Sequence, residues 1–391
     1  MRVEGDFIVI NKWLLPLSWF YGLGVKLRNM AFELGLLKSR SFDVPVISVG
    51  NITVGGTGKT PHVEYLVKHL KDLFHVAVLS RGYKRKSKGF ILATPETTMP
   101  EIGDEPFQMK KKFPHVSVAV DKSRCHGIEE LTDNDKSLDV ILLDDAFQHR
   151  YVKPGINILL VDYHRLVIYD RLLPAGRLRE PLSGKDRADI VIITKCPKDL
   201  KPMEFRVITK AMSLYPYQNL YFTTLEYGEL QPIFGEIGNL RNLRDLKEHH
   251  ILLLTGIASP EQMTHDLTPF VKDITPLTFA DHHRFKAKDI QLINETFEQL
   301  PEPRCVITTE KDATRLYDID GLSEEVRKNI YTLPVNIRFM QEQEDTFNQY
   351  IIGYVRKNSR NSILAKTKDD HKPKDSHHTG DRPRTISFRD N

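Results

Sequence analysis

One stretch, residues 45–61, constrains the fold of this chain more than any other, because it has the pattern of a strand, a glycine-rich loop and the start of a helix. Residues 46–49 form a short, mostly apolar run of the kind found in buried strands. Gly55, Gly56 and Gly58 allow the backbone to turn tightly and to point its N–H groups inward, where they can surround phosphate oxygens. The stretch therefore predicts a phosphate-binding loop at the end of a strand.

This motif is a P-loop with one departure from the general pattern G-x-x-x-x-G-K-[ST], which has Gly where this chain has Thr53. We expect Lys59 to reach the β- and γ-phosphates and Thr60 to place its hydroxyl on Mg²⁺. A turn that contains glycines by chance is the alternative, but Gly-Lys-Thr falls where a strand gives way to a helix. The motif indicates a nucleotide without distinguishing a kinase, a GTPase switch and an ATPase. The residues expected to bind the nucleotide are Thr53, Val54, Gly55, Gly56, Thr57, Gly58, Lys59 and Thr60.

The length of 391 residues accommodates two domains with separate cores, and the composition is that of a soluble globular protein. The net charge of +4 is small for this length and gives no reason to expect nucleic acid as a partner. Cys125, Cys196 and Cys305 are odd in number and lack a C-x-x-C spacing, which favours a reducing compartment and argues against a zinc site. We expect no secretory signal at the N-terminus.

Residues 13–25 are almost uncharged and contain both tryptophans, Trp13 and Trp19. The run is shorter than the roughly 18 apolar residues of a spanning helix, and apolar side chains continue at helical spacing beyond Pro16. With basic residues nearby, this pattern predicts a helix in the membrane interface. A helix that only packs on the core is the alternative, and the sequence leaves both open. We assign residues 1–40 to an apolar, membrane-associating helix packed with the core domain.

Residues 41–218 are expected to form the core domain, in which strands alternate with helices. Continuous apolar runs, typical of parallel strands buried on both faces, occur at 76–79, 116–120, 140–143, 156–161 and 190–193. The expected fold class is α/β, a P-loop NTPase-like parallel sheet covered by helices, with the P-loop at the carboxyl end of a strand.

The pattern changes after the core domain. Extended segments at 220–225 and 231–234 predict a two-stranded connector within residues 219–240. A second, smaller α/β domain is expected over residues 241–355. Residues 356–391 are polar and basic, and we predict a disordered tail there, with contact to an anionic membrane as the alternative.

Polar residues follow the apolar run at 140–143. In P-loop proteins such a strand delivers an aspartate to the magnesium shell, which makes Asp144 and Asp145 candidates. Gln148 and His149 come next and should lie at the same edge of the sheet. The alternative is that the acids only solvate a turn.

Three further segments of the core domain carry candidate side chains. Arg81 and Tyr83 close a strand and face either a substrate crevice or solvent. Asp104, in a Gly-Asp-Glu-Pro segment, could accept a proton from an attacking hydroxyl or could cap a helix. The proline-bounded loop 173–181 includes Arg179, whose guanidinium suits phosphate oxygens, although a simple ion pair would also explain it.

The second domain contributes two motifs. His282 and His283 follow Asp281, and adjacent histidines are seldom both ligands of one metal, so an Asp–His orienting pair is the better interpretation. The Thr-Glu-Lys-Asp segment 309–312 ends a strand and should cap a helix or line the cleft.

Taken together, these motifs resemble the tetraacyldisaccharide 4′-kinase family of the lipid A pathway of Gram-negative bacteria. The resemblance runs from the N-terminal apolar segment to about residue 350, and the loop with Thr53 resembles the loop of that family. The seven motifs, in order, are Gly-Asn through Gly-Gly-Thr-Gly-Lys-Thr-Pro, Ser-Arg-Gly-Tyr, Gly-Asp-Glu-Pro, Asp-Asp-Ala-Phe-Gln-His, Pro-Ala-Gly-Arg-Leu-Arg-Glu-Pro, Phe-Ala-Asp-His-His and Thr-Glu-Lys-Asp.

The resemblance implies that ATP, with Mg²⁺, phosphorylates the 4′-hydroxyl of a tetraacylated glucosamine disaccharide 1-phosphate to give lipid IVA. It implies a peripheral enzyme on the cytoplasmic face of the inner membrane, with no nucleic acid or protein partner. The implied catalytic residues are Asp104 as base, His282 as its orienting partner, Asp281, Lys59 and Arg179. The implied metal ligands are Thr60, Asp144, Asp145 and Glu180. The implied substrate contacts are Tyr83, Arg124, Gln148 and His149.

The main alternative is a P-loop GTPase-type regulatory switch or a metallochaperone. A guanine-reading N/T-K-x-D element would favour it. The segment 194–197, Thr-Lys-Cys-Pro, begins like this element but has Pro197 where the aspartate is required. The sequence therefore favours the kinase.

Overall fold

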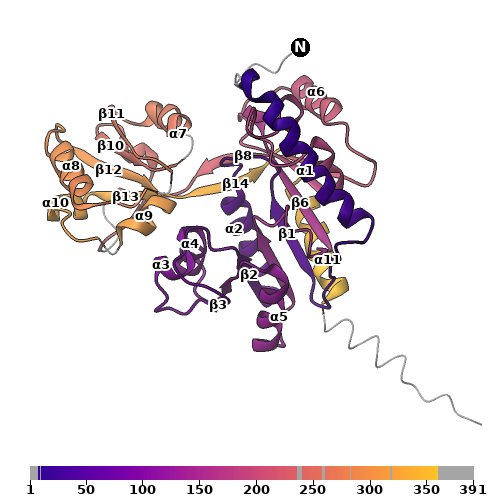
Figure 1. Cartoon of the computed structure of the whole chain (residues 1–391). Coiled ribbons are helices and arrows are strands. Elements are labelled where there is room, and N and C mark those ends of the chain that lie inside the picture. Colours follow the sequence, from indigo (N-terminus) through magenta and orange to yellow (C-terminus); the bar gives the residue numbers. More distant parts are fainter. Residues whose placement is uncertain are drawn as a thin grey trace, which may run out of the picture.

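The computed structural model describes residues 8, 10–235, 240–257, 260–281, 283–317 and 319–359, whose strands form two sheets (Figure 1). The larger sheet contains β1 (Val46–Gly50), β2 (Val76–Ser80), β3 (Ile91–Leu92), β4 (Ser117–Val120), β5 (Val140–Asp144), β6 (Ile156–Asp162), β7 (Ile190–Thr194), β8 (Asn219–Tyr227) and β14 (Val335–Phe339). The smaller sheet contains β9 (Gln231–Pro232), β10 (His250–Thr255), β11 (Asp273–Thr278), β12 (Arg304–Thr309) and β13 (Ile330–Leu333). Their strand orders are β14-β8-β7-β6-β1-β5-β2-β4-β3 and β11-β10-β12-β13-β9.

Helices accompany both sheets. Those that precede β8 or follow β14 in the chain are α1 (Leu15–Glu33), α2 (Lys59–Leu70), α3 (Met99–Ile102), α4 (Asp104–Lys112), α5 (Arg124–Asn134), α6 (Pro202–Met212) and α11 (Glu344–Asn358). Those between β8 and β14 are α7 (Pro260–Leu267), α8 (Ala287–Glu298), α9 (Glu310–Leu316) and α10 (Glu324–Lys328). Short 3-10 turns lie at Lys12–Leu14, Tyr163–Arg165, Val167–Tyr169, Leu182–Arg187, Leu243–Leu246 and Thr268–Phe270.

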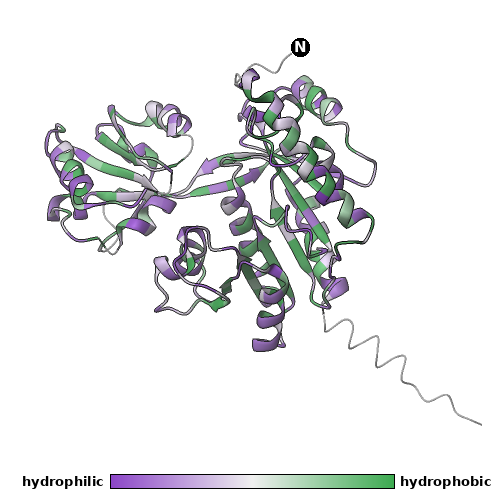
Figure 2. Ribbon diagram, viewed as in Figure 1, coloured by the Kyte–Doolittle hydropathy of each residue, from purple (hydrophilic) through white to green (hydrophobic). Residues whose placement is uncertain are grey.

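The larger sheet is parallel except at its two edges. β1 pairs in parallel with β5 and β6, and β2, β4, β7 and β8 continue the parallel order, while β3 and β14 are antiparallel. All residues of β1, β2, β5 and β7 are buried, and both sheets are largely hydrophobic in Figure 2. Burial on both faces explains the continuous apolar runs and confirms the predicted covered parallel sheet.

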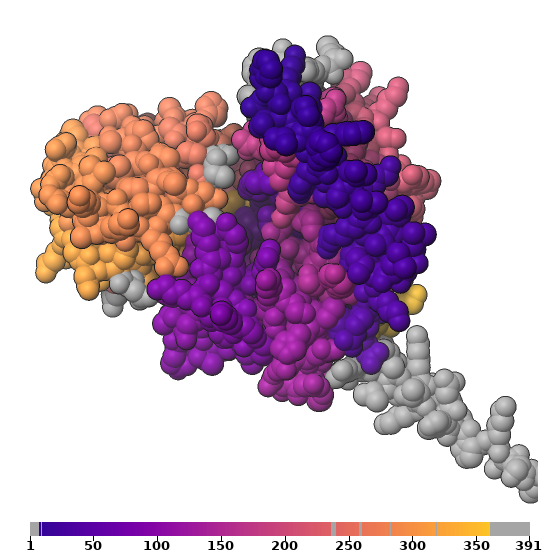
Figure 3. Space-filling model, viewed as in Figure 1, coloured from indigo at the N-terminus to yellow at the C-terminus, as the bar shows by residue number. Residues whose placement is uncertain are grey.

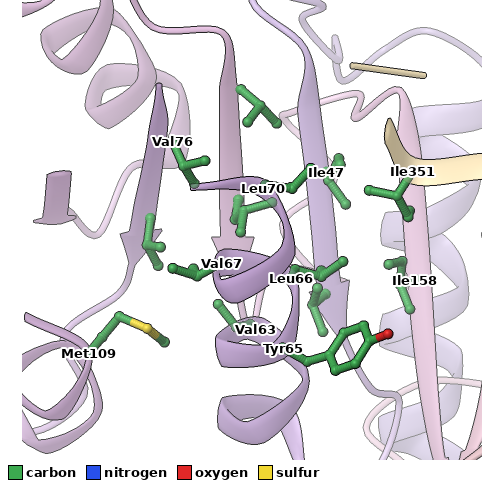
Figure 4. Packing of buried hydrophobic residues seen from close by; sticks show 14 of the residues in the cluster. Ile47, Val63, Tyr65, Leu66, Val67, Leu70, Val76, Met109, Ile158 and Ile351 are labelled. Carbon is green, nitrogen blue, oxygen red and sulfur yellow. The ribbon is translucent and has the colours of Figure 1, made fainter. Parts of the chain in front are cut away.

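Helix α2 covers the centre of the larger sheet directly after the P-loop. Its apolar side chains recur at helical spacing and face side chains of the strands and of α11. Figure 4 shows this packing for Val63, Leu66, Val67 and Leu70 of α2, Ile47 of β1, Val76 of β2, Ile158 of β6 and Ile351 of α11. The packing fixes the start of α2, and hence the P-loop, against the sheet.

The two-stranded link between the sheets differs from the prediction. Segments 220–225 and 231–234 do not pair with each other, because β8 pairs with β7 and β14, and β9 pairs with β13. The partner of β8 is the strand by which the chain returns from the smaller sheet, with Tyr227 opposite Val335 and Thr223 opposite Phe339. Figure 1 shows β8 and β14 side by side between the two sheets. Local patterning could not reveal a pairing over such a long sequence separation.

Helix α1 packs through polar contacts and leaves an apolar surface exposed. Ser18 Oγ donates a hydrogen bond to the Leu172 carbonyl oxygen at 3.0 Å, and Tyr21 Oη donates to the Arg179 carbonyl oxygen at 2.8 Å. Trp19 of α1 is 77% exposed, and Trp13, in the 3-10 turn just before the helix, is 93% exposed. Figure 3 shows α1 along the outside of the molecule. The helix thus contacts the core domain and also presents aromatic side chains to its surroundings.

No helix among the described residues has both the length and the apolar character needed to cross a bilayer. At the other end of the described chain, α11 extends to Asn358, beyond the predicted start of the tail at residue 356. The rest of that predicted tail, from residue 360, lies outside the described residues.

Phe347 of α11 is expected to be a major stabilising residue of the larger sheet. Its buried ring lies 4.5 Å from the ring of Phe339 and 5.3 Å from the ring of Tyr221, measured between centroids. Phe347→Ala should lower the free energy of unfolding by about 3–5 kcal/mol, since it leaves a cavity among packed rings. Urea unfolding followed by circular dichroism measures this. Tyr350→Ala, an exposed position of the same helix, is the control and should change stability by only about 0.5 kcal/mol. Equal effects of the two changes would contradict the packing described here.

Candidate active site

The P-loop leaves β1 and ends at the first residue of α2. Gly55 and Gly58 have φ angles of 118° and 80°, in the left-handed region that favours glycine. A side chain at Gly56 would meet no atom within 4 Å, so the loop is open on that side. Asn51 Nδ2 donates to Thr57 Oγ1 at 2.7 Å and braces the loop from within. The loop thus offers backbone N–H groups and the start of a helix to an anion.

Two residues that the sequence did not single out as functional hold this loop. Lys195 Nζ donates to the Gly56 carbonyl oxygen at 2.5 Å, and Thr194 Oγ1 donates to the Thr57 carbonyl oxygen at 3.0 Å. Both belong to the Thr-Lys-Cys-Pro segment at the end of β7. In the sequence, the only feature that drew attention to this segment was its similarity to the guanine-reading N/T-K-x-D element.

His62 is a third such residue. Burial lowers the pKa of His62 to about 4, so its imidazole is neutral at pH 7. Its Nδ1 lies 2.7 Å from the Gly58 carbonyl oxygen, which can only accept, so Nδ1 carries the proton. Its Nε2 then accepts from Thr223 Oγ1 of β8 at 3.1 Å. Nothing in the sequence distinguished His62 from an ordinary core histidine.

The paired acids lie beside the P-loop, as predicted, because β5 is the neighbour of β1. Asp145 Oδ1 is 3.7 Å from Lys59 Nζ and 3.0 Å from Arg179 Nη2. Burial raises the pKa of Asp145, but the Lys59 and Arg179 cations outweigh it and bring the pKa below its ordinary value. Asp145 also has a φ of 46°, an uncommon conformation for a residue with a Cβ that is typical of functional sites.

The carboxyl group of Asp144 differs from that of Asp145 in its hydrogen bonds and in its pKa. Ser80 Oγ donates to Asp144 Oδ2 at 3.3 Å, whereas the buried Oδ1 of Asp144 has no hydrogen-bond partner among the described residues. Burial, and then the negative charges of Glu105 and Asp145, raise the pKa of Asp144 to about 7. An unsatisfied, destabilised carboxylate next to a phosphate loop fits a divalent cation.

The donor set fits Mg²⁺ in particular. In the part of the chain that the structure describes, no three His, Cys, Asp or Glu side chains converge as a metal cage. Mg²⁺ keeps several waters and is held by one or two carboxylates together with substrate phosphates. The two neighbouring carboxylates of Asp144 and Asp145, beside the P-loop, fit that mode of binding.

Glu180, a predicted metal ligand, is already paired with one protein cation, Arg187. Its buried carboxylate is 2.8 Å from Arg187 Nη2 and accepts from Gln148 Nε2 at 2.9 Å. Gln148 Nε2 also donates to the Asn51 carbonyl oxygen at 2.6 Å. The structure therefore brings Glu180 and Gln148 to the site, where they brace the strand that leads into the P-loop.

The residues predicted to contact the substrate differ in how far they are buried. Arg124 is 2% exposed, and its guanidinium donates to the carbonyl oxygens of Asp121 and Asp144, both at 3.0 Å. A direct substrate contact by Arg124 is therefore incompatible with this structure, since the side chain lies beneath the acids. His149 lies beside it, and burial followed by the Arg124 charge lowers the pKa of His149 to about 4. Tyr83 is 56% exposed.

Asp104 begins α4 and faces the smaller sheet. Arg315 of α9, which the sequence did not indicate, donates from Nε and Nη2 to Asp104 Oδ2 at 2.9 and 2.5 Å. Lys311 Nζ, in the Thr-Glu-Lys-Asp motif, is 3.1 Å from Asp281 Oδ1. The predicted partner of Asp104, His282, lies outside the described residues. His283 Nε2 is 2.8 Å from Asp289 Oδ2 at the start of α8.

Comparisons with known proteins give consistent matches along most of the chain. A sequence model described as tetraacyldisaccharide-1-P 4′-kinase matches residues 10–356. The chain is similar to the tetraacyldisaccharide 4′-kinase of Phocaeicola vulgatus, with 60% identity over 93% of this chain and 100% of that protein. It is 56% identical to the same enzyme of Bacteroides thetaiotaomicron, over 94% of this chain and 100% of that protein. A crystal structure described as the "apo" form of LpxK from Aquifex aeolicus in complex with ATP superposes with a TM-score of 0.67 and 32% identity, over 88% of this chain and 98% of that one.

The pKa of Asp144 predicts an effect of Asp144→Asn on stability that depends on pH. A carboxyl group whose pKa is raised in the folded state destabilises that state increasingly as the pH rises from about 4, its ordinary value, to about 7. Without Mg²⁺ and nucleotide, Asp144→Asn should therefore be more stable than the wild type, by a margin that widens up to about pH 7. Urea midpoints between pH 5 and 8 measure this.

Asp145→Asn is the matched control with the opposite sign. Because the pKa of Asp145 is lowered, its carboxylate stabilises the folded protein above about pH 4. This variant should be less stable than the wild type by a margin that stays constant between pH 5 and 8. A constant margin for Asp144→Asn would contradict the raised pKa.

Proposed function

The chain belongs to the tetraacyldisaccharide-1-P 4′-kinase family, and from this premise we propose that it transfers the γ-phosphoryl group of ATP to the 4′-hydroxyl of a tetraacylated glucosamine disaccharide 1-phosphate, giving lipid IVA in lipid A biosynthesis. One observation carries the proposal on the structural side. The P-loop, the paired acids and the start of α4 share one edge of the sheet, where Glu105 is close enough to Asp144 to raise its pKa.

The nucleotide occupies the P-loop edge. Backbone N–H groups of residues 55–60 surround the phosphates, and Lys59 neutralises charge on the β- and γ-phosphates. A cavity of about 710 Å³ continues from the end of β7, where Lys195 and Pro197 line it, to Gln262 and Asp266 of α7. We place the nucleoside there. Pro197 stands where guanine-reading elements have an aspartate, which favours adenine over guanine as the base.

Thr60, Asp144 and Asp145 hold Mg²⁺, and Glu180 supports them from its pair with Arg187. The ion supplies charge neutralisation at the transferred phosphate. Arg179, 3.0 Å from Asp145, adds a further cation on the same side. Phosphoryl transfer depends on placement and charge compensation more than on covalent catalysis, and this edge provides both.

Asp104 is the general base for the acceptor hydroxyl. The new bond joins the 4′-oxygen to the γ-phosphorus, the bond from that phosphorus to the β,γ-bridging oxygen breaks, and ADP leaves. Asp104 takes the hydroxyl proton, and His282, next to Asp281 in the sequence, is the residue proposed to orient Asp104. Tyr83, Gln148 and His149 are at the edge that the disaccharide approaches.

The acyl chains and the membrane meet α1. An apolar cavity of about 580 Å³ lies between this helix and residues 167–182, lined by Trp19, Leu23 and Leu172 among others. Exposed aromatic side chains with basic neighbours are typical of helices in a bilayer interface. We therefore place the enzyme as a peripheral protein on the cytoplasmic face of the inner membrane, where its acylated substrate resides.

Transfer of ³²P from ATP to a purified disaccharide-1-phosphate lipid tests the function, with GTP in place of ATP as the control. Asp104→Ala should lower kcat about a hundredfold to ten-thousandfold with nearly unchanged ATP affinity, since the P-loop holds the nucleotide. The double variant with His282→Ala should be little slower than the slower single variant, because the two act on one step. If Asp104 has only a structural role in its ion pair with Arg315, its loss would lower the free energy of unfolding and leave kcat unaltered.

Membrane association should depend on the exposed aromatic residues of the N-terminal segment. Trp13→Ala/Trp19→Ala/Phe20→Ala should weaken cosedimentation with vesicles of anionic phospholipid while ATP affinity stays the same. Tyr215→Ala/Tyr217→Ala removes two exposed aromatic residues elsewhere and serves as the matched control. Equal vesicle binding by the triple variant and the control would refute the proposed role of α1.

A further inference from the structure

The carboxylate of Asp104 is bound by a side chain from the other sheet's helices. Asp104 belongs to α4, which packs with the larger sheet. Arg315 belongs to α9, which packs with the smaller sheet. The Nε and Nη2 atoms of Arg315 both donate to the same oxygen, Oδ2, at 2.9 and 2.5 Å. Two donors of a planar guanidinium converge on this one oxygen and hold it in the plane of the guanidinium.

Arg315 is itself held in place from behind. Its third nitrogen, Nη1, is 2.8 Å from Asp312 Oδ1, and Asp312 is completely buried. Asp312 Oδ2 accepts from the Gly256 N–H at 2.9 Å and from Thr309 Oγ1 at 2.7 Å. The guanidinium is thus the middle member of a buried chain from the core of the smaller sheet to Asp104, unlike a surface ion pair that solvent can replace.

We propose that Arg315 is a positioning residue for the phosphoryl transfer, which holds the Asp104 carboxylate toward the acceptor hydroxyl. The inference rests on the proposed role of Asp104 as the base. A neighbouring cation makes a carboxylate less basic, but this reaction has little need for a strong base, because the proton leaves late and placement dominates catalysis. A fixed orientation is therefore worth more here than basicity.

A general role in joining the two sheets is a separate possibility that the structure can test. Lys112 of α4 is 2.7 Å from Glu310 of α9, so a second ion pair bridges the same two helices without touching Asp104. Glu310→Gln removes this bridge and leaves Lys112 its other partner, Glu64, at 2.5 Å. It is the matched control for the loss of an interhelical ion pair.

The experiment compares kcat and KM for ATP in four variants and the wild type, with the lipid acceptor present. Arg315→Gln should lower kcat about ten- to hundredfold, the effect of a small misplacement of a reacting group, and leave KM for ATP within about twofold. Arg315→Lys should recover part of the loss, since it restores the charge but not the planar fork. Glu310→Gln should keep kcat within about twofold of the wild type. Asp104→Ala/Arg315→Gln should be no slower than Asp104→Ala alone.

A second variant keeps the test valid if Arg315→Gln does not fold because Asp312 loses its partner. A methyl group at Gly256 would lie 2.9 Å from Asp312 Oδ1 and 3.3 Å from Arg315 Nη1. Gly256→Ala therefore displaces the chain of contacts while all charges remain, and should lower kcat several-fold with an unchanged KM for ATP.

The outcomes separate the two levels of the proposal. An unchanged kcat in a folded Arg315→Gln or Gly256→Ala variant, or an equal loss in Glu310→Gln, would overturn the positioning role while Asp104 stays the base. Multiplicative losses in the double variant would overturn it as well. An unaltered kcat in Asp104→Ala would refute the base itself, and with it this inference.

Discussion

The parallel pairing of β1 with its two neighbours is the interaction on which the rest of this molecule depends. β1 lies between β5 and β6, with Val49 opposite Asp144 on one side and Ile158 on the other. Because parallel strands end at the same edge of a sheet, this pairing sets the P-loop beside the paired acids. Both faces of the sheet are covered, so polar chemistry is confined to that edge.

The negative charges at this edge are only partly compensated by the protein itself. Asp145 has two cations, whereas Asp144 keeps a buried oxygen without a partner and a pKa raised to about 7. The protein thus maintains a carboxylate that a bound ion would stabilise. The same edge is connected to α1, since Tyr21 bonds the backbone of Arg179 and Arg28 Nη2 donates to the Gln148 carbonyl oxygen at 3.0 Å. The helix proposed to meet the bilayer therefore rests on the loops that carry the site.

The sequence predicted well what local order encodes. Each predicted strand of the core domain is a strand, because glycine spacing and apolar runs are local signals. The P-loop and Asp144 lie together because β1 pairs with β5. The sequence could not predict contacts between distant segments, such as β8 with β14 or Arg315 with Asp104. Arg124 was misplaced for a related reason. An arginine near a sheet edge suggests a ligand contact, and only the packed structure shows that Nη1 and Nη2 of Arg124 donate to backbone carbonyls.

The path of the chain has a consequence for how the protein is made. The smaller sheet is inserted in the larger one, since the chain leaves at β8 and returns at β14. Its strands are contiguous in sequence, between residues 231 and 333, and can close while synthesis continues. In the larger sheet, β7, the inner partner of β8, is synthesised before β8. The outer partner β14 and the helix α11 are synthesised only after the smaller sheet. The first strands to emerge from the ribosome thus belong to the last sheet completed, and until then β8 presents an open edge to any other strand.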